Sequence, residues 1–131
     1  AFFSVDVSFI SLKHIFPVAQ NICAEGAKGV CLVKPQFEAG REKVGKKGVV
    51  REPEPLFEVI CQARSYAMEN GFSALGLDFS PVKGPEGNIE FLMQVEKSDA
   101  PLIFYLLAPQ SCFALLGQDL VRFWRCPAVA A

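Results

Sequence analysis

The sequence holds few of the residues from which most catalytic and metal sites are built. There is a single histidine, His14, so no Ser-His-Asp or Cys-His nucleophile can be argued from it. The five cysteines are an odd number and form no Cys-x-x-Cys pair, which argues against a zinc site or a disulfide framework. Such cysteine usage favours a reducing, cytoplasmic setting. The nucleotide-binding patterns G-x-G-x-x-G and G-x-x-x-x-G-K-[ST] are both absent.

Long apolar runs and a large net charge are also lacking. No run reaches about 18 uninterrupted apolar residues, so a membrane-spanning helix is not expected. No basic stretch precedes the first charged side chain, Asp6, so the start does not resemble a signal peptide. A formal net charge of −1 predicts that any nucleic-acid site must be a local patch. With 51% hydrophobic and 21% charged residues, the composition is that of a globular domain and excludes disordered, collagen-like and coiled-coil chains.

Strand and helix patterns alternate along most of the chain. Apolar runs predict strands over residues 1–10, 29–34, 72–80 and 88–95. Helical spacing of apolar residues predicts helices from Ser11 to Gly26 and over 53–70. The last two strands are joined by a short turn and should therefore pair antiparallel. The alternation predicts an α/β fold with a mainly parallel sheet and a terminal antiparallel hairpin.

Two features suggest that the chain is a piece of a longer protein. It opens at Ala1 directly on an apolar segment, and two parallel strands plus a hairpin make a poor core alone. We therefore expect residues 1–97 to be part of a domain. Residues 98–131 form an apolar tail of uncertain origin, which is either a helix docked on the sheet, a mis-joined coding segment or a membrane-surface helix.

Three ionisable residues are expected where buried strands end: Asp6, Lys34 and Glu90. In open α/β sheets, ligands bind outside the carboxyl ends of the parallel strands. Glu90 lies in an apolar segment, where an ionised carboxylate needs a partner. One cluster, with Lys34 between the two acids, satisfies all three and would orient the lysine as a general base or proton relay. In the alternative, Asp6 caps the next helix, Lys34 reaches solvent and Glu90 pairs with it incidentally.

A run of positive charge lies in the long loop predicted over residues 36–52. Its central part, residues 41–51, carries only one acid, Glu42, against Arg41, Lys43, Lys46, Lys47 and Arg51. The interleaved glycines permit close approach to a phosphate chain. The alternative is a solvated, flexible loop with no ligand.

Three segments closely resemble one enzyme family. They are DVSFISL at 6–12, LVKPQFEAGREKVGKKGVVRE at 32–52 and SPVKGPEGNIEFL at 80–92. They resemble the hemolysin A-like (TlyA-type) ribosomal RNA methyltransferases of the FtsJ-like 2′-O-methyltransferase superfamily, over about Val5 to Lys97. The resemblance implies the C-terminal half of a Rossmann-like, S-adenosylmethionine-dependent methyltransferase fold, usually preceded by an S4 RNA-binding domain.

The resemblance also implies roles for individual residues. The family uses a Lys-Asp-Lys-Glu tetrad, whose last three members match Asp6, Lys34 and Glu90. Lys34 would then orient or deprotonate the ribose 2′-hydroxyl, while the two acids hold it in place. Ser8 and Phe9 would lie near the S-adenosylmethionine cofactor or the target nucleotide. The ribosomal RNA backbone would be gripped by Arg41, Lys43, Lys46, Lys47 and Arg51.

Some parts of the family pattern have no counterpart in this sequence. They are the glycine-rich first turn, the acidic residue after the second strand, the first tetrad lysine and the S4 domain. We therefore expect the chain alone to bind cofactor weakly or not at all, and not to turn over. The implied partner is ribosomal RNA or a ribosomal subunit, without a metal or a membrane. The alternatives are a non-catalytic RNA- or ribosome-binding module and a membrane-active hemolysin, which the family's name suggests.

Overall fold

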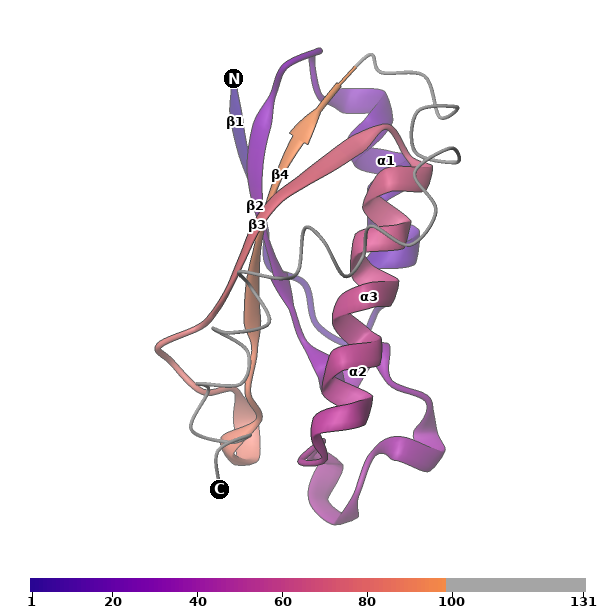
Figure 1. The fold of residues 1–131 in the computed structure, drawn as a ribbon, viewed down its shortest axis with the longest axis vertical. Helices are drawn as coiled ribbons and strands as arrows, with labels where there is room; N and C mark the ends of the chain where they lie inside the picture. Colours follow the sequence, from indigo (N-terminus) through magenta and orange to yellow (C-terminus); the bar gives the residue numbers. More distant parts are fainter. Residues whose placement is uncertain (99–131) are drawn as a thin grey trace.

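A computed structural model describes residues 1–98 of the chain (Figure 1). Their strands are β1 (Phe2–Val5), β2 (Lys28–Val33), β3 (Phe72–Phe79) and β4 (Phe91–Lys97). Their α-helices are α1 (Leu12–Ile22), α2 (Pro35–Glu38) and α3 (Pro53–Glu69), all on the same face of the sheet (Figure 1). The interpretations of the apolar tail concern residues that, apart from Ser98, lie outside this described part.

The four described strands form one mixed sheet in the order β1-β2-β4-β3. β1 and β2 are parallel, whereas β4 is antiparallel to both β2 and β3. The antiparallel hairpin is thus present, but only one of the three ladders is parallel, so a mainly parallel sheet is not confirmed. The reason is that β4 inserts between β2 and β3, and the apolar pattern of a strand does not encode which neighbours it will have.

The core lies between this sheet and the helices. α1 buries Phe16, whose ring centroid lies 5.5 Å from that of Phe72 in β3. Phe72 also contacts Phe3 of β1, with ring centroids 5.8 Å apart. β4 alternates as a strand with one buried face should, because its fully buried side chains are Phe91, Met93 and Val95. α3 contributes Leu56, Val59, Ile60, Ala63 and Ala67.

The segment predicted as a loop over 36–52 has more structure than expected. α2 starts at Pro35, a residue suited to the first turn of a helix, and two 3₁₀ turns follow at Arg41–Lys43 and Lys46–Gly48. The Glu38 carboxylate of α2 accepts hydrogen bonds from the Ser11 hydroxyl (2.6 Å) and the Leu12 N–H (2.7 Å). The carboxylate thereby pairs hydrogen-bond donors at the N-terminus of α1 and links α2 to α1.

Candidate functional site

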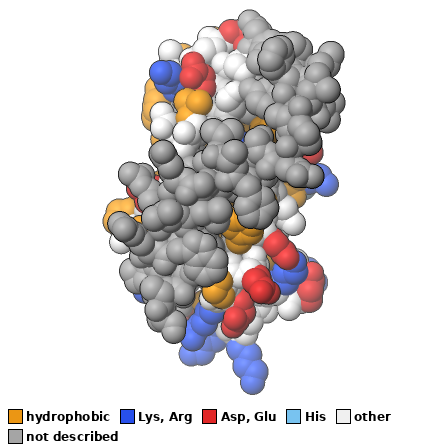
Figure 2. Space-filling model, viewed as in Figure 1, with side chains coloured by type: hydrophobic (Ala, Val, Ile, Leu, Met, Phe, Trp, Pro, Cys, Tyr) orange, Lys and Arg blue, Asp and Glu red, His pale blue; other side chains and the backbone are white. Residues whose placement is uncertain are grey.

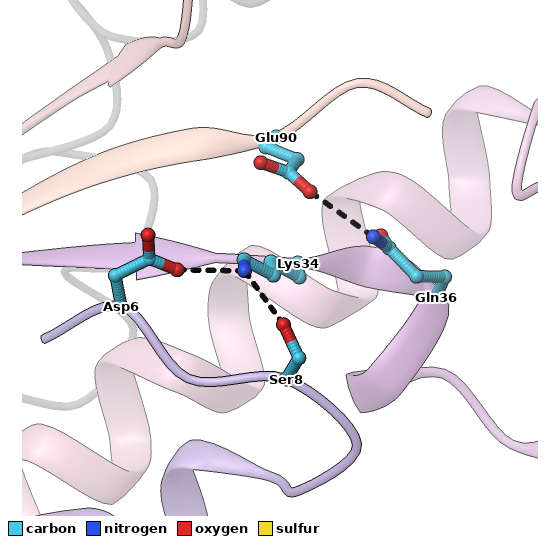
Figure 3. Close-up of polar contacts among 5 residues, drawn as sticks. All are labelled: Asp6, Ser8, Lys34, Gln36 and Glu90. Atoms are coloured by element: carbon cyan, nitrogen blue, oxygen red, sulfur yellow. Dashed lines mark hydrogen bonds and ion pairs between the residues drawn. The ribbon is translucent and has the colours of Figure 1, made fainter. Parts of the chain in front are cut away.

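The carboxyl ends of β1, β2 and β3 share one edge of the sheet, because these strands run in the same direction. Asp6 directly follows β1, and Lys34 directly follows β2. β4 runs the opposite way, so its first residues lie at the same edge, and Glu90 directly precedes it. The sheet topology therefore brings all three sequence-predicted residues into one region (Figure 3).

Lys34 is held by two oxygens of the segment after β1. Its Nζ lies 2.6 Å from Asp6 Oδ1 and donates a hydrogen bond to Ser8 Oγ at 3.0 Å (Figure 3). The Lys34 side chain is only 12% exposed, whereas that of Asp6 is 71% exposed. The amine is therefore fixed at the rim of the sheet rather than extended into solvent. Asp6 binds this lysine, and the N-cap of α1 is Ser11.

Glu90 has a different partner from the one expected. It is 7% exposed, and its Oε1 accepts a hydrogen bond from Gln36 Nε2 at 3.1 Å (Figure 3). Within residues 1–98 no ion pair joins Glu90 to Lys34, so of the two expected partners of the lysine only Asp6 pairs with it. The cause is α2, which starts directly after Lys34 and carries Gln36 to the carboxylate in its first turn.

Two further residues shape the surroundings of Glu90. A Cβ atom on Gly84 would lie 2.3 Å from Glu90 Oε1, so only glycine leaves room for the carboxylate there. The Oε1 atom of Gln36 is buried and has no hydrogen-bond partner within the described part of the chain. A buried acceptor without a donor is uncommon in folded proteins, and at such an edge it is suited to receive one from a ligand.

An exposed aromatic residue stands beside the lysine. Phe9 directly follows Ser8, is 90% exposed and has a φ of 63°. This left-handed conformation is uncommon for a bulky residue, and such strain concentrates at functional sites. The ring of Phe9 contacts Phe37 of α2, with centroids 4.9 Å apart. The pair presents an aromatic surface next to Lys34.

The basic loop, residues 41–51, borders a hollow of about 430 Å³. The lining includes four of its five predicted cations, namely Lys43, Lys46, Lys47 and Arg51. Lys43 is also paired with Glu58 of α3, and this hydrogen bond and charge raise the pKa of the lysine above its usual value. Figure 2 shows Lys and Arg side chains at the lower end of the molecule, to which the loop extends in Figure 1.

The profile of the FtsJ-like methyltransferase family matches residues 2–97. The chain belongs to this FtsJ-like family. It is 49% identical over 94 residues to YqxC of Bacillus subtilis, described as a candidate rRNA methyltransferase, a match that covers 72% of this chain and 34% of YqxC.

Other relatives of this FtsJ-like chain are named either as rRNA methyltransferases or as hemolysins. The 16S/23S rRNA (cytidine-2′-O)-methyltransferase TlyA of Mycobacterium tuberculosis is 39% identical over 88 residues, covering 67% of this chain and 33% of TlyA. A solved structure described as a candidate hemolysin of Streptococcus thermophilus matches with a TM-score of 0.75 and 44% identity, covering 95% of this chain and 44% of that one. The FtsJ-like chain thus spans about a third of the length of the curated relatives named here.

The described part of the FtsJ-like chain has no group of three or more His, Cys, Asp or Glu side chains placed to hold a metal ion. None of its helices has the length and apolar character needed to span a bilayer. Burial raises the pKa of the Cys31 thiol to about 12, and neighbouring Cys23 adds to the shift. Cys31 therefore stays protonated and unreactive at neutral pH.

Asn88 is a structural residue of the FtsJ-like domain that the sequence reasoning missed. It is 2% exposed, and its Oδ1 accepts a hydrogen bond from the Val50 N–H at 3.1 Å. Its Nδ2 donates to the Gly48 carbonyl at 2.9 Å and to the Pro85 carbonyl at 3.1 Å. Asn88 therefore fastens the basic loop to the β3–β4 connection. An asparagine between a glycine-rich turn and an apolar strand was the available indication, since buried polar groups need partners.

Replacing Asn88 by alanine is expected to destabilise the chain. The Val50 N–H would lose its buried acceptor, which costs about 1–3 kcal/mol. For a domain of this size, each kcal/mol lowers Tm by about 4–8 °C. Thermal unfolding followed by circular dichroism measures the change, with Asn21→Ala on the exposed side of α1 as the matched control. Equal Tm values for the two variants would contradict the fastening role.

Proposed function

We propose that this chain is part of an S-adenosylmethionine-dependent methyltransferase that modifies the ribose 2′-hydroxyl of ribosomal RNA in the cytoplasm. The observation that carries the proposal is the fixed Lys34 amine, bound by Asp6 and Ser8 at the carboxyl edge of the sheet. The name of the TlyA relative states this reaction type, and the shared FtsJ-like domain is the reason to extend it to this chain.

The proposed chemistry centres on one proton. A ribose hydroxyl is a weak nucleophile near neutral pH, and a positioned side chain can orient it or accept its proton as the oxygen attacks. Lys34 performs that step as a neutral amine, which becomes an ammonium when it accepts the proton, and Asp6 and Ser8 fix the position of its Nζ. Glu90, held by Gln36, provides a second carboxylate at the same edge. Most of the rate gain comes from holding the hydroxyl in line with the methyl group.

S-adenosylmethionine, when bound, supplies the methyl group. The residues proposed to lie near it, Ser8 and Phe9, are both exposed at the rim, and Phe9 offers an aromatic face to a nucleoside of the cofactor or of the RNA. The hollow of about 430 Å³ borders the basic loop instead of these residues. Ser8 and Phe9 would therefore form only one wall of a cofactor site, and this chain does not enclose the cofactor at these residues. We expect this chain alone to bind the cofactor weakly or not at all.

The basic loop is proposed to bind the RNA backbone. Lysine and arginine side chains neutralise phosphates and release counterions, which supplies affinity without reading sequence. Arg41, Lys46, Lys47 and Arg51 form no ion pair with another described residue and can each take a phosphate. Lys43 contributes less, because Glu58 already neutralises it. The Asn88 contacts keep the end of the loop in a defined place, which suits positioning of a substrate better than a flexible loop would.

The test of this function is a chimera of the Bacillus subtilis relative, in which residues 2–97 of this chain replace the matched segment of YqxC. The YqxC chimera is expected to transfer tritiated methyl groups from S-adenosylmethionine to ribosomal RNA, at ribose 2′-oxygens identified by mass spectrometry. The 131-residue chain alone is expected to transfer none, because it carries only part of the site.

The other outcomes separate the remaining candidates. A folded chimera that binds ribosomal RNA but transfers no methyl group would favour a non-catalytic RNA-binding module. Leakage of dye from liposomes, without any methyl transfer, would favour the membrane activity suggested by the hemolysin A name of the Brachyspira hyodysenteriae relative. Methyl groups found on bases instead of riboses would contradict the proposed role of Lys34.

A further inference from the structure

Two short turns of the chain have nearly the same backbone conformation. They are Gly45–Gly48 in the basic loop and Gly84–Gly87 between β3 and β4, both of the form Gly-x-x-Gly. Their first glycines share a φ of −71° and a ψ of −176°. Their third residues, Lys47 and Glu86, have φ values of 68° and 57°, and left-handed glycines follow both. Two left-handed, non-glycine residues in matching turns indicate a built feature rather than an irregular loop.

Asn88 links the two turns, because its side chain donates to a carbonyl of each. A second cleft of about 340 Å³ lies here, lined by Val49, Val50, Arg51, Lys83, Glu86, Gly87 and Ile89. It shares Val49 and Arg51 with the hollow on the basic loop. The two spaces therefore adjoin, and Arg51 stands between them.

The lining of this cleft combines two kinds of surface. Val49 and Val50 are buried and Ile89 is half-buried, so they give an apolar floor. Arg51 and Lys83 are exposed cations that form no ion pair with another described residue. At Gly87 no heavy atom lies within 4 Å of the position a Cβ would take, so a ligand can approach the backbone closely. A nucleotide has both matching parts, an apolar base or ribose face and a phosphate.

We infer that the cleft between the two turns is a second RNA site that takes one nucleotide of single-stranded RNA, with its phosphate on Arg51 and Lys83. This inference rests on the proposed RNA methyltransferase function and adds a contact that the charge run over 41–51 does not contain. Lys83 is isolated in sequence from other cations, and only the folding of the β3–β4 connection against the basic loop places it beside Arg51. Glu86 lies on the same rim and opposes a phosphate there.

The inference is tested by binding of the complete 131-residue chain to fluorescein-labelled oligocytidylate, followed by fluorescence anisotropy at several salt concentrations. Lys83→Gln is expected to weaken binding about fivefold and to lower the slope of log K against log salt by about 0.7, the value for one phosphate contact on a single strand. Lys28→Gln removes the same charge from the first residue of β2, at the opposite end of that strand from Lys34, and should change neither quantity. Lys83→Arg should restore binding.

Glu86→Gln gives the opposite expectation, which a folding defect could not imitate. Removing this carboxylate should strengthen binding of the same probe severalfold. If Lys83→Gln and Lys28→Gln bind equally while Lys46→Gln weakens binding, the inference fails and RNA binding by the basic loop stands. If the unmodified chain does not bind oligocytidylate, both fail. If Lys83→Gln weakened the binding of a polyglutamate peptide as much as the binding of oligocytidylate, the cleft would be a general anion surface. That result would also overturn the inference.

Discussion

Replacing Lys34 by alanine in the YqxC chimera is expected to lower the rate of methyl transfer by at least about a hundredfold. Lys34 is the one described side chain that both Asp6 and Ser8 hold, and it carries the proposed proton step. Single-turnover transfer to ribosomal RNA measures the loss. Binding of the RNA should change much less, because the cations of the basic loop are intact.

Arginine at the same position tests whether Lys34 accepts a proton or only supplies a positive charge. Lys34→Arg keeps the positive charge and can pair with Asp6, but its guanidinium stays protonated and cannot accept the hydroxyl proton. It should therefore be nearly as slow as Lys34→Ala. Lys28→Ala serves as the control, since Lys28 starts β2 and Lys34 follows its other end. Full activity of Lys34→Arg would show that the residue only supplies charge and would remove the proton step from the mechanism.

Asp6 and Lys34 could be predicted from the sequence because their position follows from local patterns alone. Each directly follows an apolar run, and parallel strands end at a common edge whatever the rest of the fold does. Glu90 could be assigned to the same edge only with the direction of the last strand, which the short turn before it supplied. The boundaries of α3 and β3 were also close to prediction, because their apolar spacing is regular, whereas β4 starts at Phe91 instead of at the predicted residue 88.

The pairing of Lys34 with Asp6 was predicted, but the partner of Glu90 and the contacts of Asn88 were not, because they depend on contacts between segments far apart in the chain. Gln36 reaches Glu90 through α2, a four-residue helix too short to show a helical period. The insertion of β4 between β2 and β3 depends on the pairing of whole strands. Asn88 likewise contacts the basic loop, from which it is far separated in sequence. Strand ends, and the ion pair between Asp6 and Lys34 that stands at two of them, are thus predictable from sequence, whereas the partner of Glu90 is not.

One segment joins the two halves of the proposed function. Asn88 fastens the basic loop, and two residues later Glu90 faces Gln36 in the candidate catalytic region. The Gly84–Gly87 turn immediately before them borders both the second cleft and the Glu90 carboxylate. The connection that borders the proposed RNA site is therefore also the connection that lies against Glu90. This shared connection is a physical route from one proposed site to the other.

That route leads to the second large expected effect, for Gly84→Ala. The added methyl group would meet Glu90 Oε1 at 2.3 Å and Cδ at 2.8 Å, so the carboxylate must move. The Gly84 backbone is not left-handed, and the contacted atoms are the end of a flexible side chain, so stability should change little. A displacement of about 1 Å in a catalytic site can cost about a hundredfold in rate. The YqxC chimera with Gly84→Ala should therefore keep its Tm and lose most of its methyl transfer.

The role of Glu90 in that loss can be isolated with a double-mutant comparison. Gly76→Ala is the matched control, because its new methyl group would lie 3.8 Å from Gln94, an ordinary contact. If Gly84→Ala acts only by moving the carboxylate, adding it to Glu90→Ala should slow transfer no further. Additive losses of rate would mean that the methyl group of Gly84→Ala disturbs the Gly84–Gly87 turn itself. In that case the variant would act through RNA binding at the turn and not through the Glu90 carboxylate. The two readings differ in the oligocytidylate affinity of Gly84→Ala, which stays unchanged only if the carboxylate is the target.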